Sequence, residues 1–311
     1  MKVLITGASG FIGRSLSAEL PNHGHTVRVA VRSANVHLDM FERAIISSMD
    51  SETDWSAALN SVNIVIHLAS RVHVMYDKVA DPLAEFRKVN VDGTLKLAEQ
   101  AAKVGVKRFI FISSIKVNGE RTELDRPFTE EDASNPQDNY GLSKHEAELG
   151  LLLIAQQTEM EVVIIRPPLV YGPGVKANFA SLIKAVKSKI PLPFGAISNK
   201  RSFVYVGNLV SLIARCIHHP AAANQIFLVS DGHDISITEL LQGCALALGV
   251  KPRLLPISQS LIEVCAALLG KREVAQRICG NLQVDISKSR DLLGWSPPIL
   301  VSDGLKATTR D

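Results

Sequence analysis

The sequence opens with Lys2-Val3-Leu4-Ile5-Thr6 and turns at once through Gly7-Ala8-Ser9-Gly10-Phe11-Ile12-Gly13. The first five residues predict a buried strand, and the apolar residues after Gly10 predict the start of a helix. A glycine-rich turn between a strand and a helix exposes backbone N–H groups and the positive end of the helix to a pyrophosphate. Gly7 permits the tight turn, Gly10 lets the backbone approach phosphate, and Gly13 lets the helix pack on the strand. This stretch therefore predicts a dinucleotide-binding unit.

The second predicted strand, Thr26 to Val31, ends at the position that commonly decides between NAD and NADP. An acidic residue there accepts hydrogen bonds from the adenosine ribose, whereas an arginine pairs with the 2′-phosphate of NADP. Here the strand ends in Val31-Arg32. A valine side chain cannot accept a hydrogen bond, whereas the planar guanidinium of Arg32 can bind phosphate. We therefore expect NADP(H) to be favoured, with NAD possible.

The alternation of elements in the first half of the chain predicts a Rossmann-type, doubly wound parallel sheet of the α/β class. After Arg166 the rhythm is broken by Pro167-Pro168 and Gly172-Pro173-Gly174. We expect residues 1–166 to bind the dinucleotide and residues 167–311 to form a smaller, interwoven region that binds substrate and does not fold alone. Strands are expected at Val27–Val31, Ile64–Leu68, Phe109–Ser113 and Val162–Arg166, and helices near Pro82–Val104 and Asn139–Gln157.

Length, composition and charge narrow the class of protein. The chain has 311 residues, a net charge of +3 and a pI of about 8.6, which is too mild to indicate nucleic-acid binding. The N-terminus does not read as a signal peptide, and no apolar stretch has transmembrane length. The most apolar segment, Leu261–Leu269, is expected to be a core or capping helix, with a surface contact as the alternative. We expect a cytoplasmic protein.

The cysteines predict neither disulfide bonds nor a metal centre. No C-x-x-C motif is present, and each cysteine lies in apolar surroundings. We expect all of them to be reduced side chains in the core, at Cys216, Cys244, Cys265 and Cys279.

A candidate catalytic pair stands at the start of a predicted helix. Tyr140 and Lys144 are separated by three residues, so their side chains share one face. An ammonium group near a phenol lowers the pKa of the phenol from about 10 and makes it an acid or base nearer neutral pH. Ser113 and Ser114 end the preceding strand, where ligands bind in open α/β sheets. One of these hydroxyls is expected to contact a substrate oxygen, and the other to cap the strand end.

Together these motifs resemble the extended short-chain dehydrogenase/reductase family. Nearly the whole chain is similar to the branch of NAD-dependent epimerases and dehydratases that act on nucleotide sugars. The resemblance rests on the glycine turn, on Ser114 and on Tyr140-x-x-x-Lys144. It implies a nicotinamide cofactor, redox chemistry on a sugar and no metal. Further matching motifs are His67-Leu68-Ala69, Asn90-Val91-Asp92-Gly93-Thr94, Arg166-Pro167, Val170-Tyr171-Gly172-Pro173-Gly174, and Asp285 before Leu293-Gly294-Trp295.

The resemblance also implies roles for single residues. Ser114, Tyr140 and Lys144 would be catalytic, and Lys144 would also hold the nicotinamide ribose. Asn90 would lie near the cofactor or, alternatively, support the catalytic loop. His67 is expected to be a packed imidazole at a strand end and not a catalytic group. The residues expected to bind the cofactor are Gly7, Gly10, Phe11, Ile12, Gly13, Arg32, Leu68, Ala69, Asn90, Tyr140 and Lys144.

A UDP-linked sugar is the substrate that the resemblance implies. Asn178 and Arg201 match positions that hold the diphosphate in relatives, and a guanidinium meets phosphate oxygens in a bidentate manner. Leu192 and Phe194 could sandwich the uracil, with core packing as the alternative. Asp285 could touch the ligand or cap the helix that follows it.

The segment after the catalytic serine departs from the epimerase pattern. Relatives carry S-x-x-V-Y-G, whereas this chain reads Ser114-Ile115-Lys116-Val117-Asn118-Gly119. Lys116 and Asn118 would alter how the sugar is held or would only face solvent. The Asp-Glu pair of dehydratases is also missing after Ser114, which disfavours dehydration.

The sequence ranks an NADPH-dependent reductase first, chiefly because of Val31-Arg32. Such an enzyme would reduce the 4-keto group of a UDP-linked 6-deoxy-N-acetylhexosamine for bacterial surface polysaccharide, the O-antigen of lipopolysaccharide. The alternative is a UDP-glucose or UDP-N-acetylglucosamine 4-epimerase with bound NAD, which uses the same residues. A non-catalytic NADP-sensing protein is a third hypothesis, and the Tyr140–Lys144 pair argues against it. The resemblance further implies a homodimer, formed through the helices near Pro82–Val104 and Asn139–Gln157.

Overall fold

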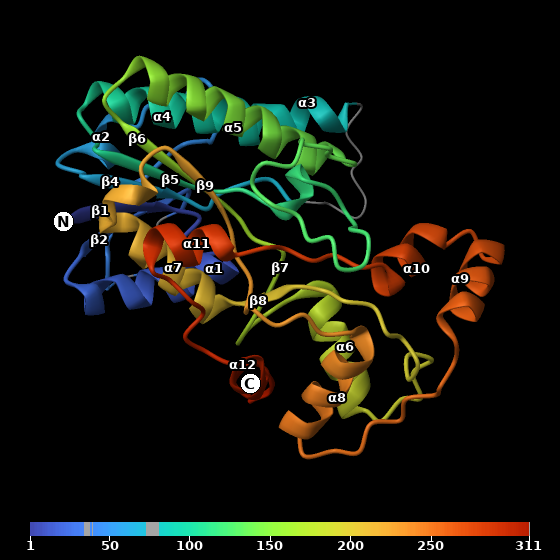
Figure 1. Ribbon diagram of the computed structural model, residues 1–311. Coiled ribbons are helices and arrows are strands. Elements are labelled where there is room, and N and C mark those ends of the chain that lie inside the picture. Colours follow the sequence, from blue (N-terminus) through green and yellow to red (C-terminus); the bar gives the residue numbers. More distant parts are fainter. Residues whose placement is uncertain (34–37, 39, 73–80, 311) are drawn as a thin grey trace.

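The computed structural model describes residues 1–33, 38, 40–72 and 81–310 (Figure 1). Within these ranges the main sheet is parallel and has the strand order β3-β2-β1-β4-β5-β6-β9. Successive strands are added in one direction from β1 to β3 and in the other from β4 to β6, which confirms the predicted doubly wound α/β fold. The strands are β1 (Lys2–Thr6), β2 (Thr26–Val31), β3 (Glu42–Ile45), β4 (Ile64–His67), β5 (Arg108–Ile112), β6 (Glu161–Arg166) and β9 (Gln225–Leu228).

Helices cover both faces of the main sheet, because the central strands are apolar on both faces. Val3 and Ile5 of β1 belong to one core cluster, and Leu4 between them belongs to the other. Figure 1 shows the helices as layers on either side of the strands. One face carries α1 (Phe11–Glu19), α7 (Val206–His218) and α11 (Ser287–Leu293), and the other carries α2 (Ser56–Leu59), α4 (Gly93–Lys103) and α5 (Asn139–Gln157).

The long helix expected near Pro82–Val104 has three parts. It consists of α3 (Pro82–Arg87), a π-helical segment η2 (Lys88–Asp92) and α4. A Cβ on Gly93 would lie only 2.7 Å from the carbonyl oxygen of Met49, so α4 begins in close contact with the chain beside β3. Such π-helical turns are frequent at functional sites.

The C-terminal half forms a second layer of structure beside the sheet (Figure 1). Its helices pack around a third hydrophobic cluster that includes Phe179, Leu241 and Leu305. The same half also supplies β9 and α7, which complete the main sheet and its cover. The remaining elements are β7 (Leu169–Tyr171), which pairs in parallel with β8 (Phe203–Tyr205), the helices α6 (Ala177–Lys187), α8 (Ile237–Ala247) and α12 (Val301–Thr309), and the 3₁₀ turns η1 (Leu20–His23), η3 (Ile115–Val117) and η4 (Pro220–Ala222).

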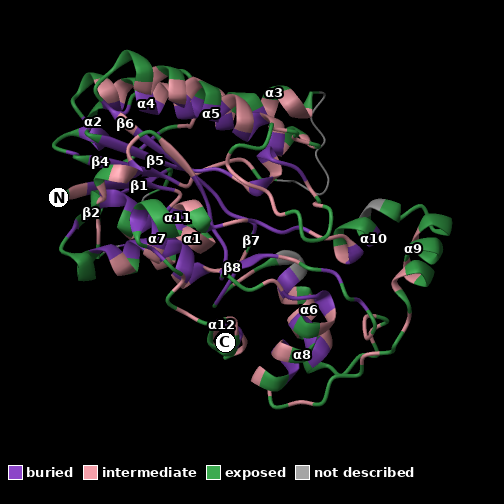
Figure 2. Ribbon diagram, viewed as in Figure 1, coloured by how far each residue is buried: buried purple, intermediate pink, exposed green. Residues whose placement is uncertain are grey.

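A helical hairpin, α9 (Gln259–Leu268) and α10 (Arg272–Cys279), projects from the body of the protein (Figure 1). No residue of α9 is buried, and Figure 2 shows this helix as one of the most exposed parts of the fold. The expectation of a core helix at Leu261–Leu269 is therefore wrong, although Ile262 of α9 packs on the third hydrophobic cluster. Cys265 on α9 is exposed for the same reason, whereas the other three cysteines are buried.

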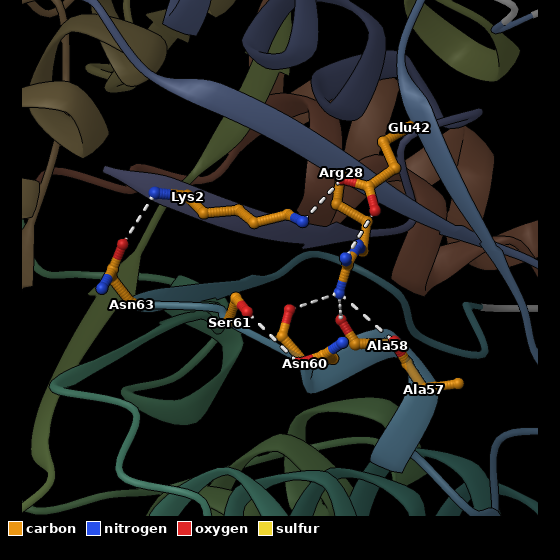
Figure 3. A network of polar contacts seen from close by, with 8 residues as sticks. All are labelled: Lys2, Arg28, Glu42, Ala57, Ala58, Asn60, Ser61 and Asn63. Carbon is orange, nitrogen blue, oxygen red and sulfur yellow. Dashed lines mark hydrogen bonds and ion pairs between the residues drawn. The ribbon is translucent and has the colours of Figure 1, made fainter.

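Arg28 on β2 joins neighbouring elements at one side of the sheet (Figure 3). Its Nη1 donates to the carbonyl oxygens of Ala58 at 2.7 Å and Asn60 at 2.8 Å, where α2 ends. Its Nη2 lies 2.5 Å from the carboxylate of Glu42 on β3, and Lys2 on β1 lies 2.7 Å from the same carboxylate. These hydrogen bonds lower the pKa of Glu42 and tie three adjacent strands to α2.

Two negative findings apply to the described ranges only. None of their helices combines the length and the apolar character needed to cross a membrane. Those ranges also contain no group of three or more His, Cys, Asp or Glu residues placed to bind a metal ion.

Candidate functional site

A cavity of about 960 Å³ opens where β1, β2, β4 and β5 end. The glycine turn lines one part of it, and Ser113, Ser114 and Tyr140 line another. This is the edge of an open α/β sheet at which ligands bind, and the volume is that of a site for a small molecule or cofactor.

The glycine turn leaves the end of α1 open toward a ligand. Gly7 has a φ of +70°, and a Cβ there would lie 2.7 Å from the backbone nitrogen of Ala69. A Cβ on Gly13 would lie 2.2 Å from the carbonyl oxygen of Gly7, so α1 packs directly on the turn. Gly10 is the N-cap of α1, and no side chain caps this helix. The first N–H groups of α1 are therefore available to a phosphate.

Most of the other residues expected to bind the cofactor also line the cavity. Phe11 and Ile12 follow the turn, and Leu68 and Ala69 follow β4. Arg32 lines the cavity as well and is exposed to solvent. Its guanidinium can therefore reach a charged group at the end of β2.

Tyr140 lies in the first turn of α5. Asp138 caps that turn, because its carboxylate accepts the N–H of Gly141 at 2.7 Å. The side chains of Tyr140 and Ser70 are hydrogen-bonded. Loss of water raises the pKa of Tyr140 to about 12, and the charge of Asp138 adds to the rise. The expectation that Lys144 lowers this pKa is therefore wrong, because desolvation outweighs it in this structure.

Lys144 is buried against β5 and does not line the cavity. Its Nζ donates to the carbonyl oxygen of Ile112 at 2.8 Å and lies 4.3 Å from the centroid of the Phe111 ring. The same Nζ is 6.0 Å from the centroid of the Tyr140 ring. Burial lowers the pKa of Lys144 to about 7, and Glu148 partly opposes the change. The side chain is thus held where it can gain or lose a proton near neutral pH.

The two serines after β5 are in different situations. Ser114 caps η3, because its Oγ accepts the N–H of Lys116 at 3.3 Å. The Oγ of Ser113 is buried and has no hydrogen-bond partner among the residues that the structure describes. Both serines line the cavity. The capping serine is therefore Ser114, whose own O–H remains free to donate, and the hydroxyl of Ser113 has no described partner at all.

Asn90 and His67 lie behind the cavity wall. The side chain of Asn90 donates to the carbonyl oxygen of Arg71 and to Ser143, both at 3.0 Å, and accepts the N–H of Arg71 at 2.7 Å. These bonds join the loop after β4 to α5, which is the supporting role given above as the alternative for Asn90. His67 is enclosed between two threonine hydroxyls, and burial lowers its pKa to about 3. It is therefore a neutral, packed imidazole.

Leu192, Phe194 and Arg201, which were expected to contact the uracil and the diphosphate, do not line this cavity. Leu192 and Phe194 pack on the hydrophobic cluster of the C-terminal half, which is the alternative stated for them. Arg201 is half-buried, and its Nη1 donates to the carbonyl oxygen of Gly280 at 2.9 Å. Asn178 is in the first turn of α6, and its side chain is outside what the structure describes.

Asp285 makes the contacts of a helix cap. Its carboxylate accepts the N–H of Ser287 at 2.7 Å and the hydroxyl of the same residue at 2.5 Å. Ser287 is the first residue of α11, so the carboxylate satisfies an N–H that the helix leaves free.

Lys116 and Asn118, which depart from the epimerase pattern, both hold the loop after Ser114. The ammonium of Lys116 contacts the carboxylate of Asp138 and lies 3.1 Å from that of Glu120. Asn118 accepts a hydrogen bond from the buried Arg166 at 2.9 Å. Neither side chain lines the cavity.

Three further residues near the site escaped the sequence analysis. Ser70 bonds to Tyr140, and its place directly after His67-Leu68-Ala69 could have indicated it. Arg277 on α10 lies 3.6 Å from Glu120, and the charge of Glu120 also acts on Arg201. Glu120 and Arg277 are far apart in sequence and belong to no motif, so only the fold could bring them together.

A family model described as the NAD dependent epimerase/dehydratase family matches residues 3–230. The chain belongs to this family. It is 50% identical to the "UDP-glucose 4-epimerase" of Vibrio cholerae, over 99% of this chain and 94% of that protein. The identification of an epimerase/dehydratase-type, NAD(P)-dependent enzyme is thereby confirmed.

Solved structures share the fold along the whole chain. The UDP-N-acetylglucosamine 4-epimerase from Bacillus cereus gives a TM-score of 0.81 at 19% identity and covers 99% of this chain and 98% of its own. The UDP-glucuronic acid 4-epimerase from Bacillus cereus, solved in complex with NAD, gives 0.78 at 24% identity, with 99% and 97% covered. At these identities the likeness is one of fold.

The cavity fits the nicotinamide dinucleotide of this family. The uncapped start of α1 offers N–H groups for a pyrophosphate. A Cβ on Gly10 would meet only the carbonyl oxygen of Gly7, at 3.1 Å, so the protein leaves open the space before the turn. The Oγ of Ser113 supplies an unsatisfied hydroxyl in the part of the cavity that holds Tyr140. The glycine turn would hold the phosphates, and the Tyr140 region would face the nicotinamide.

Proposed function

We propose that this protein is a UDP-hexose 4-epimerase that keeps NAD bound. The observation that carries the proposal is the shared cavity, in which the hydroxyls of Tyr140 and Ser114 stand beside a turn fit for a dinucleotide. The relative that is 50% identical over 99% of the chain, a UDP-glucose 4-epimerase, supports the same reaction. The comparisons thus reverse the order in which the sequence alone placed the reductase and the epimerase.

The residues of the cavity would exchange a proton with the oxygen on C4 of the sugar. NAD, when bound, supplies a group that accepts hydride and returns it. Tyr140 would take the proton of the C4 hydroxyl and give it back, since a phenol within reach of the oxygen can act in both directions. Ser114, or the unsatisfied Ser113, would donate a hydrogen bond to the same oxygen. Lys144 would hold the nicotinamide ribose.

A second candidate is NADPH-dependent reduction of a UDP-linked 4-keto sugar. Two observations favour it. Val31 and the exposed Arg32 line the cavity where an acidic residue would bind the ribose of NAD. The raised pKa of Tyr140 also suits a group that donates a proton, which a ketone reduction needs. Under this hypothesis the enzyme would prefer NADP(H) and would serve the synthesis of bacterial surface polysaccharide.

We propose that two arginines bind the diphosphate of the substrate. Arg201 and Arg277 act on one carboxylate, Glu120, from two separate parts of the C-terminal half. A diphosphate could replace that carboxylate as the partner of both guanidinium groups, because arginine binds phosphate in a bidentate manner. Asn178 would assist them, whereas the packing of Leu192 and Phe194 and the cap at Asp285 argue against a ligand role for these three residues.

We also propose a homodimer formed through α5 and the adjoining helices. Leu149 and Leu153 of α5 are half exposed, at 50% and 55%, and lie one helical turn apart on its outer face. Burial of these leucines against a second copy would remove them from water. Sedimentation analysis of the wild type and of the L149E/L153E variant tests this; a wild-type monomer at micromolar concentration would contradict it.

Turnover with and without reductant tests the reaction. The purified protein is incubated with UDP-glucose or UDP-N-acetylglucosamine and no added cofactor, and separately with a UDP-linked 4-keto-6-deoxy sugar and NADPH. Conversion to the 4-epimer without reductant is expected. Loss of NADPH in proportion to the keto sugar, without epimerisation, would instead establish the reductase. Binding of dinucleotide with no turnover in either assay would favour a sensor.

A further inference from the structure

The α9–α10 hairpin presents an apolar surface that nothing in the described chain covers. Leu268 and Leu269, at the turn between the helices, are 82% and 73% exposed. Leu261 and Val264 on α9 and Val274 on α10 are each at least half exposed. These five side chains are called the apolar tip. Side chains of this kind normally lie inside a protein, so their exposure points to a contact outside this chain.

The spacing of the exposed residues along α9 makes the surface continuous. Leu261, Val264, Cys265 and Leu268 recur at the intervals that place side chains on one helix face, and all four are exposed. Ile262 and Ala266, on the other side, are partly buried. α9 therefore packs on the third hydrophobic cluster through Ile262 and also carries apolar side chains on its outward face.

Basic residues are concentrated in the segment that contains the hairpin and the chain leading into it. Residues 249–280 contain five basic and two acidic side chains, an excess of three that equals the net charge of the whole chain. The rest of the protein is therefore neutral in sum. The basic residues are Lys251, Arg253, Lys271, Arg272 and Arg277, and the acidic ones are Glu263 and Glu273.

Four of these five cations face solvent and form no ion pair with a carboxylate that the structure describes. Arg277 lies 3.6 Å from Glu120 at the base of the hairpin. Lys271 and Arg272, directly after the tip leucines, are exposed, and so are Lys251 and Arg253. None of these four forms an ion pair with a described residue. Their charge is therefore available to an external partner.

We propose that the α9–α10 hairpin docks the enzyme on an anionic lipid bilayer. The leucines of the apolar tip enter the boundary between headgroups and acyl chains, and Lys271 and Arg272 lie at the lipid phosphates. An amphipathic helix with an apolar face and basic flanks is the kind of element that binds in this interface. This inference goes beyond the proposed reaction and does not depend on it.

The charge pattern favours a bilayer over a second copy of the chain. Two hairpins that met tip to tip would bring their like charges together, which opposes association. An anionic membrane, in contrast, attracts Lys271 and Arg272 beside the tip and accepts the leucines without a shaped pocket.

Vesicle sedimentation with the full-length protein tests the proposal. Vesicles of phosphatidylcholine with one quarter phosphatidylglycerol are compared with vesicles of phosphatidylcholine alone. We expect binding to the anionic vesicles that weakens as salt is added. L268S/L269S should lower the partition coefficient at least about tenfold, and K271E/R272E should do the same on anionic vesicles only. Turnover without vesicles should stay at the wild-type level in both variants, which shows that they are folded.

L246S is the matched control, because Leu246 on α8 is 80% exposed and lies outside the hairpin. This variant should bind vesicles as the wild type does. Failure of the wild type to bind anionic vesicles, or equal loss of binding in L246S and L268S/L269S, would overturn the proposal. Concentration-dependent self-association that L268S/L269S abolishes, without vesicle binding, would overturn it in favour of a second copy. These vesicle-binding results do not depend on which sugar the enzyme converts.

Discussion

At the cofactor end of the cavity, backbone N–H groups of one turn form the binding site. At the proposed substrate end, long side chains from separate loops would form it. The glycine turn is held by contacts within a few residues and by β4, as the close approach of Gly7 to Ala69 shows. Arg201 and Asp285, in contrast, are engaged in contacts that hold the fold itself. A short motif can specify the first kind of site, because its geometry is local. The second kind depends on tertiary packing.

The largest effect is expected from removal of the Tyr140 hydroxyl. Y140F should lower kcat by about a thousandfold, because general acid–base groups contribute on the order of 10² to 10⁴ in rate. Dinucleotide affinity, measured by fluorescence titration, should change less than about twofold, since the glycine turn is untouched. Activity within tenfold of the wild type would show that another group transfers the proton.

Two glycine variants distinguish the packing of α1 on the turn from the access of the dinucleotide to the backbone of the turn. G13A places a Cβ 2.2 Å from the carbonyl oxygen of Gly7, and we expect a loss of about 3 kcal/mol in the free energy of unfolding. At Gly10 the φ is −74° and a Cβ would meet one atom, the carbonyl oxygen of Gly7 at 3.1 Å, so G10A should cost less than G13A, about 1 kcal/mol. G10A should nevertheless weaken dinucleotide binding at least about tenfold.

Urea unfolding and cofactor titration of both variants check this pair. G105A is the control, because a Cβ on Gly105 meets nothing within 4 Å although its φ is +82°. It should leave cofactor affinity unchanged. If G13A unfolds at the same urea concentration as the wild type, or G10A binds dinucleotide with wild-type affinity, then backbone contacts do not form this end of the site.

Burial of Lys144 should cost stability in a pH-dependent way. The folded pKa of about 7 lies below the ordinary 10.5, so between these values the unfolded chain binds more protons and wild-type stability rises with pH. K144M removes this cost but leaves the carbonyl oxygen of Ile112 without its donor. We expect the variant to be about 2 kcal/mol more stable at pH 7 and to lose this advantage toward pH 10. Denaturant unfolding at several pH values measures the difference, and an advantage that grows with pH would contradict the buried ammonium.

The sequence could predict the parts of the fold that local pattern controls. The helix expected near Asn139–Gln157 is found with the same bounds, because its capping residue, Asp138, stands directly before it in the sequence. The strand Glu42–Ile45 was not predicted, since only Ala44 of its four residues is buried. The π-helical segment was also missed, because it depends on the contact of Gly93 with the distant Met49.

In the candidate site, too, features set by local sequence could be predicted and features set by tertiary packing could not. The residues of the glycine turn line the cavity, and their positions follow from the turn. The pKa of Tyr140 was expected in the wrong direction, because desolvation by tertiary packing is invisible in the sequence. The role of Lys116 could not be foreseen either, since its partner Asp138 reaches it only in the folded loop.

A smaller effect is expected from the Lys116–Asp138 pair beside Tyr140. The charge of Asp138 raises the pKa of Tyr140, and Lys116 offsets that charge. D138N keeps a good helix cap but removes the charge, so the pH limb of kcat assigned to Tyr140 should move down by about half a unit. K116Q should move it up by a similar amount. Shifts of the same sign in the two pH profiles would contradict an electrostatic role.

The smallest effect is expected at Asp285. D285A removes the cap of α11 and should cost about 1 kcal/mol of unfolding free energy. The KM for the UDP-sugar should stay within about twofold, since capping contacts engage the carboxylate. Thermal unfolding and steady-state kinetics measure the two quantities. A large rise in KM at unchanged stability would show that Asp285 contacts the ligand at the substrate end of the cavity.

The most direct test of the proposed function follows the hydrogen on C4. UDP-glucose that carries deuterium at C4 is incubated with the purified protein in ordinary water, without added cofactor, and the product is analysed by NMR and mass spectrometry. The account predicts the 4-epimer with deuterium retained at C4, because Tyr140 exchanges only the proton on oxygen and the hydride returns to the same carbon. Loss of deuterium from C4 to solvent, or no 4-epimer from UDP-glucose or UDP-N-acetylglucosamine, would contradict it.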